Sequence, residues 1–145
     1  MNPIIEGVAA RTFAPLFLRA ALAAVFIFHG LDKVSPAAHY GTHWMPDAMP
    51  AQPAIVQLLV AWGELIGGIC VALGLLTRYA AIGLIIIMIG AIVTVTGKNG
   101  FGLQTGGFEY NIVLILLCAA LVLTGPGTFS LDRIIHVKMR GPAQY

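Results

Sequence analysis

The chain has 145 residues, of which 59% are hydrophobic and only 10% are charged. A soluble domain carries about 25% charged residues, so this composition excludes an ordinary water-soluble protein. The formal charge of +2 is small and the basic residues are scattered, so no nucleic-acid-binding surface is expected. The sequence therefore predicts one all-α domain, residues 1–145, embedded in a lipid bilayer.

The first apolar segment runs from about residue 13 to residue 31 and is interrupted by Arg19. About 19 residues at roughly 1.5 Å each just cross the hydrocarbon core of a bilayer. Pro15 fits the first turn of a helix that starts here, where a missing N–H costs nothing. Because Arg19 breaks the apolar run, we expect no cleavable signal and predict that this helix is retained as a span.

Residues 32–53 form the one long connection, which contains four prolines. A short interfacial helix near residues 36–43 is one interpretation of its start. His39 and His43 have the spacing that places two imidazoles on one helical face, as in metal sites. A loop this rich in proline need not be helical, however, so we expect exposed loop histidines and no metal site.

Three further apolar segments predict three further transmembrane helices, over about residues 54–76, 79–96 and 108–124. The third span is rich in isoleucine, but a backbone in lipid must pair its polar groups within the span, so helix is predicted. Thr77 and Arg78 are predicted to form a tight turn. A glycine-rich connection precedes the last span, and a polar tail, residues 125–145, follows it. The four spans are expected to form an antiparallel bundle.

An even number of spans places both termini on one side of the membrane. That side would carry five basic residues, and the other side would carry only Lys33 and Lys98. The positive-inside rule then places both termini in the cytoplasm and the 32–53 loop in the periplasm.

Glu64 lies near the middle of the second span, with Gly63, Gly67 and Gly74 predicted close to one helical face. Glycines at such spacings let helices approach closely in lipid. A carboxylate inside a span is costly and by default indicates a functional site. The alternative is a structural carboxylate that pairs with Arg19 or with a backbone group.

Three other polar residues are candidates for the same ligand-binding site. With the predicted topology, His29 and Glu109 lie near the outer ends of their spans and converge on Glu64, whereas Arg19 lies deeper. Such a pocket could hydrogen-bond a quinone-like headgroup and exchange protons. The alternatives are that Arg19 extends its charge to the interface and that Glu109 is stabilised by the dipole of its helix.

These residues fall in three blocks that resemble the DoxX family of small four-helix membrane proteins. The match covers roughly residues 16–133. The blocks are Arg19 with Phe28-His29-Gly30-Leu31-Asp32-Lys33, Glu64-Leu-Ile-Gly67-Gly68 with Leu73-Gly74-Leu75-Leu76-Thr77-Arg78, and Gly125-Pro126-Gly127-Thr-Phe-Ser130-Leu131-Asp132. Gly107-Phe108-Glu109 also fits the opening of the family's last helix.

The resemblance implies a four-helix bundle in a bacterial or archaeal cytoplasmic membrane. Members are associated with quinone-linked oxidoreduction, including thiosulfate:quinone oxidoreductase, and with membrane partners of redox-defence enzymes. We therefore expect a membrane subunit that binds quinone and needs a redox partner, since the chain shows no ligands for haem, flavin or iron–sulfur clusters. Two alternatives remain: a non-catalytic accessory subunit of a larger complex, or a small-molecule- or metal-handling component, which would need a homo-oligomer.

Overall fold

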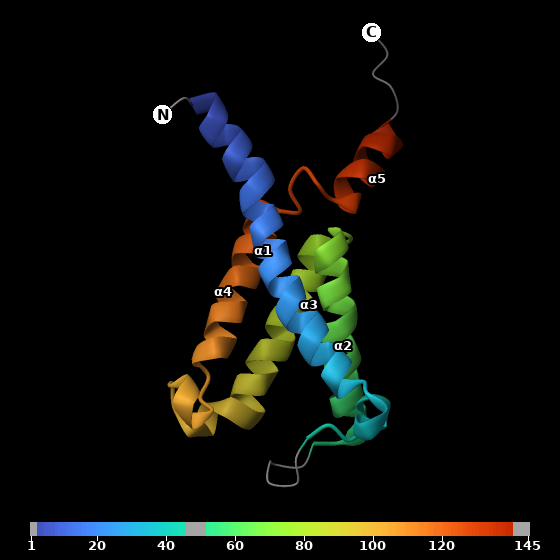
Figure 1. Cartoon of the computed structure of the whole chain (residues 1–145), viewed down its shortest axis with the longest axis vertical. Helices are drawn as coiled ribbons and strands as arrows, with labels where there is room; N and C mark the ends of the chain where they lie inside the picture. The colour runs from blue at the N-terminus through green and yellow to red at the C-terminus, as the bar shows by residue number, and fades with distance from the viewer. Residues whose placement is uncertain (1–2, 46–51, 141–145) are drawn as a thin grey trace.

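The computed structural model describes residues 3–45 and 52–140, and every regular element within those ranges is helical. Four long helices form the body of the molecule (Figure 1): α1 (Pro3–Lys33), α2 (Ala54–Leu73), α3 (Thr77–Ala91) and α4 (Glu109–Thr124). A shorter helix, α5 (Leu131–Arg140), projects away from that body (Figure 1). The all-helical prediction is confirmed.

The four long helices pack around one core, and the two ends of the bundle carry different connections. The helix α1 packs along α2, and α3 packs along α4. The buried apolar side chains at their junction come from all four helices: Leu22, Phe26, Val71, Ala81, Leu84, Met88, Leu114, Cys118 and Leu121. We call the end that carries η1 (Pro36–Gly41), η3 (Gly97–Asn99) and η4 (Leu103–Thr105) the loop end. The opposite end, with residues 74–76 and 125–130, is the turn end (Figure 1).

The outer surfaces of the long helices are apolar. Three helical segments are long and apolar enough to cross a membrane, Arg11–Lys33, Ala54–Leu73 and Thr77–Asn99. Large side chains on these surfaces are exposed, including Phe17 (70%) and Leu123 (81%). Water would make so much exposed apolar area costly, whereas lipid tails accommodate it, so the fold is that of a membrane protein.

The predicted start of the first helix is wrong. The helix α1 begins at Pro3, so Pro15 lies inside it rather than in its first turn. Hydropathy marks where a helix enters lipid, and it does not register a helix that continues beyond that point. Pro15 has no N–H to offer the Arg11 carbonyl, which lies beside Gly127 at the turn end.

The predicted turn between the second and third spans is also displaced. The helix α2 ends at Leu73, and Gly74 adopts a left-handed conformation with φ of 67°. The N–H of Leu75 then donates to the Cys70 carbonyl at 2.9 Å, which terminates the helix. Gly74 is therefore a helix terminator, and it is also closely packed, because a Cβ atom there would lie 2.6 Å from Cβ of Ser130 and 2.8 Å from the Arg19 guanidinium. Thr77 is already the first residue of α3.

Other glycines do let the helices approach closely. A Cβ atom on Gly30 of α1 would lie only 2.6 Å from the backbone nitrogen of Leu65 in α2. Gly67 and Gly63 face α3, where a Cβ atom on each would lie 2.9 Å from the end of the Leu84 or the Ile87 side chain. This close approach of α1 to α2 brings the polar residues at the loop end of both helices into contact.

The end of the third span departs from a regular helix. After Ala91 the chain forms one π-helical segment, η2 (Ile92–Thr96), before η3 begins. Single π-turns inside helices often mark functional positions. Here the segment carries Thr96 next to Asn111 of α4. In the long loop, η1 occupies part of the region where a short helix was one interpretation, but it is not a regular helix, because His39 and Tyr40 within it have φ of 47° and 56°.

Candidate functional site

The loop end contains a cavity of about 340 Å³ that we call the loop-end chamber. Residues of α1, α2, α3, α4, η2 and η4 form its walls, together with the loop residue Trp44. Its polar lining residues are His29, Lys33, Trp44, Glu64, Thr96, Tyr110 and Asn111. Mostly apolar walls with a few convergent polar groups are typical of sites for small organic ligands.

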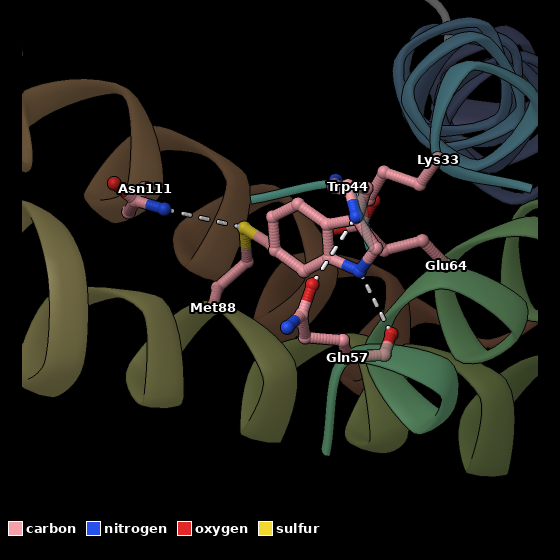
Figure 2. A network of polar contacts seen from close by, with 6 residues as sticks. All are labelled: Lys33, Trp44, Gln57, Glu64, Met88 and Asn111. Atoms are coloured by element: carbon pink, nitrogen blue, oxygen red, sulfur yellow. Dashed lines mark hydrogen bonds and ion pairs between the residues drawn. The ribbon is translucent and has the colours of Figure 1, made fainter. Parts of the chain in front are cut away.

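An ion pair between Lys33 and Glu64 lies in the wall of this chamber. The Lys33 ammonium donates to Oε2 of Glu64, which joins α1 to α2 (Figure 2). The side chain of Glu64 is only 5% exposed and that of Lys33 is 16% exposed. The ammonium also lies 5.0 Å from the centre of the Trp44 ring. A buried carboxylate needs such a partner, because an unpaired charge in this environment is costly.

Trp44 is held in place by Gln57 of α2. Its ring nitrogen Nε1 donates to the Gln57 carbonyl at 2.9 Å, and its backbone N–H donates to Oε1 of Gln57 at 3.2 Å (Figure 2). A second cavity of about 220 Å³, lined almost entirely by apolar groups of α2 and α3, shares Trp44, Val60, Ala91 and Val95 with the chamber. The polar chamber therefore borders an apolar groove, and Trp44 belongs to both walls.

Asn111 presents a buried amide with weak internal partners. Its Nδ2 donates only to the Met88 sulfur, at 3.5 Å (Figure 2), and its Oδ1 accepts from the Thr96 hydroxyl at 3.2 Å. A thioether is a poor acceptor. A carbonyl oxygen of a ligand in the chamber would be a better partner for this amide.

Two of the predicted site residues, His29 and Glu64, line the same chamber. His29 is exposed, and its ring lies edge-on to Phe28 at 5.4 Å. The residue that meets Glu64 is Lys33, one helical turn beyond His29. The suggestion that Glu64 pairs with Arg19 is wrong, because Arg19 lies at the turn end of the molecule, against the carbonyl oxygens of Val71 and Ala72.

Glu109 lies in the first turn of α4, and it does not contribute to the chamber wall. Its Oε2 accepts the backbone N–H of Leu103 at 3.0 Å, which ties η4 to the start of α4. Leu103 itself lines the chamber. The structure therefore separates Glu109 from Glu64 and His29 and connects it to the chamber through the glycine-rich loop.

Arg19 connects two backbone segments at the turn end. Its guanidinium donates to the carbonyls of Val71 (2.9 Å), Ala72 (2.7 Å), Pro126 (3.1 Å) and Phe129. Arg19 as a residue is only 4% exposed. The first two carbonyls belong to the last turn of α2, where the helix dipole favours a cation. The third and fourth belong to the 125–130 segment.

Five polar residues of the chamber were not among the predicted site residues: Lys33, Trp44, Thr96, Tyr110 and Asn111. Lys33 was recognisable, because its spacing of four from His29 places both on one face of α1. Asn111 was recognisable as an amide inside an apolar helix. Trp44 was not, because no periodicity links a loop residue to the helices on which it packs.

His39 and His43 lie together in and beside η1, with ring centres 5.0 Å apart. Within residues 3–45 and 52–140, no three histidine, cysteine, aspartate or glutamate side chains are grouped as a metal site would require. The hydroxyl of Thr42 lies 2.8 Å from Nδ1 of His43. The described residues thus offer two imidazoles and no third ligand.

Comparisons with known proteins find a matching family and several relatives. The DoxX family model matches residues 14–97, which is more than half of the chain. A Bacillus subtilis protein named "Putative oxidoreductase CatD" is 33% identical over 120 residues, covering 83% of this chain and 85% of the relative. An uncharacterized Haemophilus influenzae protein is 30% identical over 128 residues, covering 83% and 82%. An uncharacterized membrane protein of Mycobacterium tuberculosis is 39% identical over 83 residues, covering 48% and 49%. No solved structure matches the chain with significant similarity.

Proposed function

The chain belongs to the DoxX family, and from that premise we propose that it is a membrane subunit that binds a quinone-like amphipathic molecule in the loop-end chamber. The name of the Bacillus subtilis relative contains the word oxidoreductase, which supports a redox context. We further propose that electrons reach the bound molecule from a partner protein that carries a redox cofactor, and that this chain supplies the binding site and the protons.

The observation that carries this proposal is the polar chamber with an apolar groove at its side. A quinone has a polar ring and an apolar tail. The chamber offers Lys33, Glu64 and Asn111 to a ring, and the groove offers Val56, Ile86 and other apolar side chains to a tail. Trp44, in both walls, provides a flat surface against which a ring can stack.

The residues of the chamber suit this chemistry. The Lys33 ammonium has three donors, and only one of them is used by Glu64, so it can also donate to a carbonyl oxygen. The Asn111 amide can donate to a second one. Glu64 and His29 can take up and release protons, as general acid–base groups do. When bound, a quinone accepts two electrons and two protons and becomes a quinol.

Fluorescence quenching of Trp44 tests the proposal directly. Trp62 lies outside the chamber lining and donates to the Tyr40 carbonyl, so Trp62→Phe leaves Trp44 as the sole tryptophan reporter. In this background, decylubiquinone should quench the fluorescence saturably. Glu64→Gln should weaken binding about tenfold, because it removes the charged hydrogen bond that holds the Lys33 ammonium in the chamber wall, and such bonds are worth about 1.5–3 kcal/mol. Equal affinity with and without the Glu64 carboxylate would contradict its role.

Two comparisons sharpen this experiment. A tail-less ubiquinone ring should bind more weakly than decylubiquinone if the groove holds the tail. Glu109→Gln should leave the affinity unchanged, since an amide oxygen can still accept the Leu103 N–H; a loss as large as that of Glu64→Gln would place Glu109 in the binding site after all. If neither probe quenches saturably, the accessory-subunit alternative is favoured.

We also propose that the 145 residues form one domain with four spans in an antiparallel bundle. The helix α4 has 16 residues and a length of about 24 Å, shorter than the other three segments, and its apolar faces continue the core. The basic residues at the turn end favour cytoplasmic termini in a bacterial or archaeal cytoplasmic membrane.

Cysteine labelling tests this topology. In a background that lacks Cys70 and Cys118, Lys98→Cys at the loop end should react with a membrane-impermeant maleimide on intact cells. Lys138→Cys in α5 should react only after the membrane is permeabilised. The reverse pattern would invert the topology, and labelling of both positions in intact cells would contradict an even number of spans.

A further inference from the structure

The turn end carries a further hollow, of about 830 Å³, which is separate from the two loop-end cavities and which the proposed function does not use. Residues of α1, α3, α5 and the 125–130 segment line it. Four of its lining side chains are basic: Arg11, Arg78, Arg133 and His136. We call this feature the basic hollow. It lies at the opposite end of the molecule from the loop-end chamber (Figure 1).

None of the three arginines forms an ion pair in the part of the chain that the structure describes. Lys33 and Glu64 form the one ion pair found there, so no described carboxylate lies within 4.0 Å of these guanidinium groups. Arg78 and Arg133 also lie in the first turns of α3 and α5. A cation is unfavourable there, because the helix dipole is positive at that end. Helix stability therefore does not account for these arginines.

One carboxylate, Asp132, does line the basic hollow, but it is already engaged. Its Oδ1 accepts the backbone N–H of Leu76 at 2.7 Å, and its Oδ2 accepts both the N–H and the hydroxyl of Thr77 at 2.9 Å. Asp132 thus caps α3 and links it to α5. The surface of the hollow remains positive.

The depth of the hollow corresponds to the headgroup region of a bilayer. One apolar span ends at Leu73 and the next begins at Thr77, so this end of the bundle is where hydrocarbon would meet water. The helix α5 supports this placement. It carries exposed apolar side chains such as Ile134 and Val137 beside basic ones, the pattern of a helix that lies in the membrane interface. Part of the hollow's wall, Ile82 and Val122, is apolar.

We propose that the basic hollow binds the phosphate of an anionic phospholipid, with the acyl chains against the apolar part of its wall. Guanidinium groups bind phosphate oxygens through paired hydrogen bonds, which suits a site with three arginines from three helices. Occupation would neutralise the uncompensated charge and hold α1, α3 and α5 together. This site is independent of the loop-end chamber, so either proposal can fail without the other.

Native mass spectrometry of the chain released from nanodiscs of equal parts phosphatidylglycerol and phosphatidylcholine tests this site. The wild-type chain should retain phosphatidylglycerol in preference to phosphatidylcholine. The double variant Arg78→Gln/Arg133→Gln should retain it less by on the order of tenfold, since each basic residue near an anionic surface contributes about 1 kcal/mol. Lys98→Gln, which removes an equally exposed charge at the loop end, is the matched control and should behave as wild type.

Three outcomes would overturn the proposal. The first is equal retention of the two lipids by the wild-type chain, and the second is unchanged retention in the double variant. The third is displacement of the lipid by millimolar inorganic phosphate, which would indicate a site for a soluble anion. If the double variant does not fold, Arg11→Gln alone is measured in the same way, with a smaller loss of phosphatidylglycerol expected and wild-type retention counting against the site.

Discussion

Replacing Arg19 with methionine is expected to lower the free energy of unfolding by at least about 3 kcal/mol. The substitution removes the guanidinium that donates to four backbone carbonyls, those of Val71, Ala72, Pro126 and Phe129. Of these, the Val71 carbonyl keeps a second donor, the Gly74 N–H at 3.2 Å. Each buried acceptor that loses its donor costs about 1–3 kcal/mol, although water can reach part of this region. Equilibrium unfolding in mixed detergent micelles measures the loss.

Two control variants separate the geometry of Arg19 from its charge. Arg19→Lys keeps the positive charge but has a point-like ammonium in place of the planar fork, so it should recover only part of the stability. Lys98→Gln removes an exposed charge at the loop end, outside both the Arg19 site and the basic hollow, and should change stability by no more than about 0.5 kcal/mol. If Arg19→Met were as stable as wild type, the guanidinium would not be what joins α2 to the 125–130 segment.

Lys33→Met is the second substitution with a large expected effect. It leaves the Glu64 carboxylate buried without a cation, which should cost about 3–5 kcal/mol of unfolding free energy. Lys33→Met should lower the stability more than Glu64→Gln does, because the charge that it leaves without a partner is the more deeply buried one. The Glu64 side chain is 5% exposed and the Lys33 side chain is 16% exposed. The same unfolding assay measures it.

A double-mutant cycle shows whether the loss arises from the ion pair. In Lys33→Met/Glu64→Gln the uncompensated charge is gone, so the double variant should be more stable than Lys33→Met alone. The coupling energy should be about 1.5–3 kcal/mol, as for contacting residues in one polar network. Strictly additive losses would mean that the two side chains do not interact. In that case Lys33 would act through its contact with Trp44, 5.0 Å away.

The architecture follows from composition and hydropathy to a large extent. Continuous apolar segments must be helical in lipid, so α2, α3 and α4 could be located to within a few residues. The ends of the helices could be located less precisely than the apolar segments themselves. The helix α1 begins at Pro3, before the apolar segment that hydropathy marks, and the end of α2 depends on the left-handed conformation of Gly74, which hydropathy does not detect.

The candidate site was predictable in part. Glu64 and His29 were identified because a titratable group inside an apolar helix is costly and therefore requires an explanation. Their partners were not, since Lys33 was counted only as a loop charge and Trp44 only as an interfacial aromatic. Arg19 and Glu109 are equally conspicuous in the sequence, but neither side chain lines the chamber, and the structure pairs both with backbone groups.

The sequence by itself determined that this is a membrane protein and which buried polar residues have to be compensated, because both follow from the cost of placing charge in hydrocarbon. Only the tertiary structure decided how each one is compensated. Gly30 lets α1 approach α2 closely enough for Lys33 to reach Glu64, and the termini of α2 and α4 converge on Arg19. These contacts join residues far apart in the chain, and helix packing, rather than local spacing, brings them together.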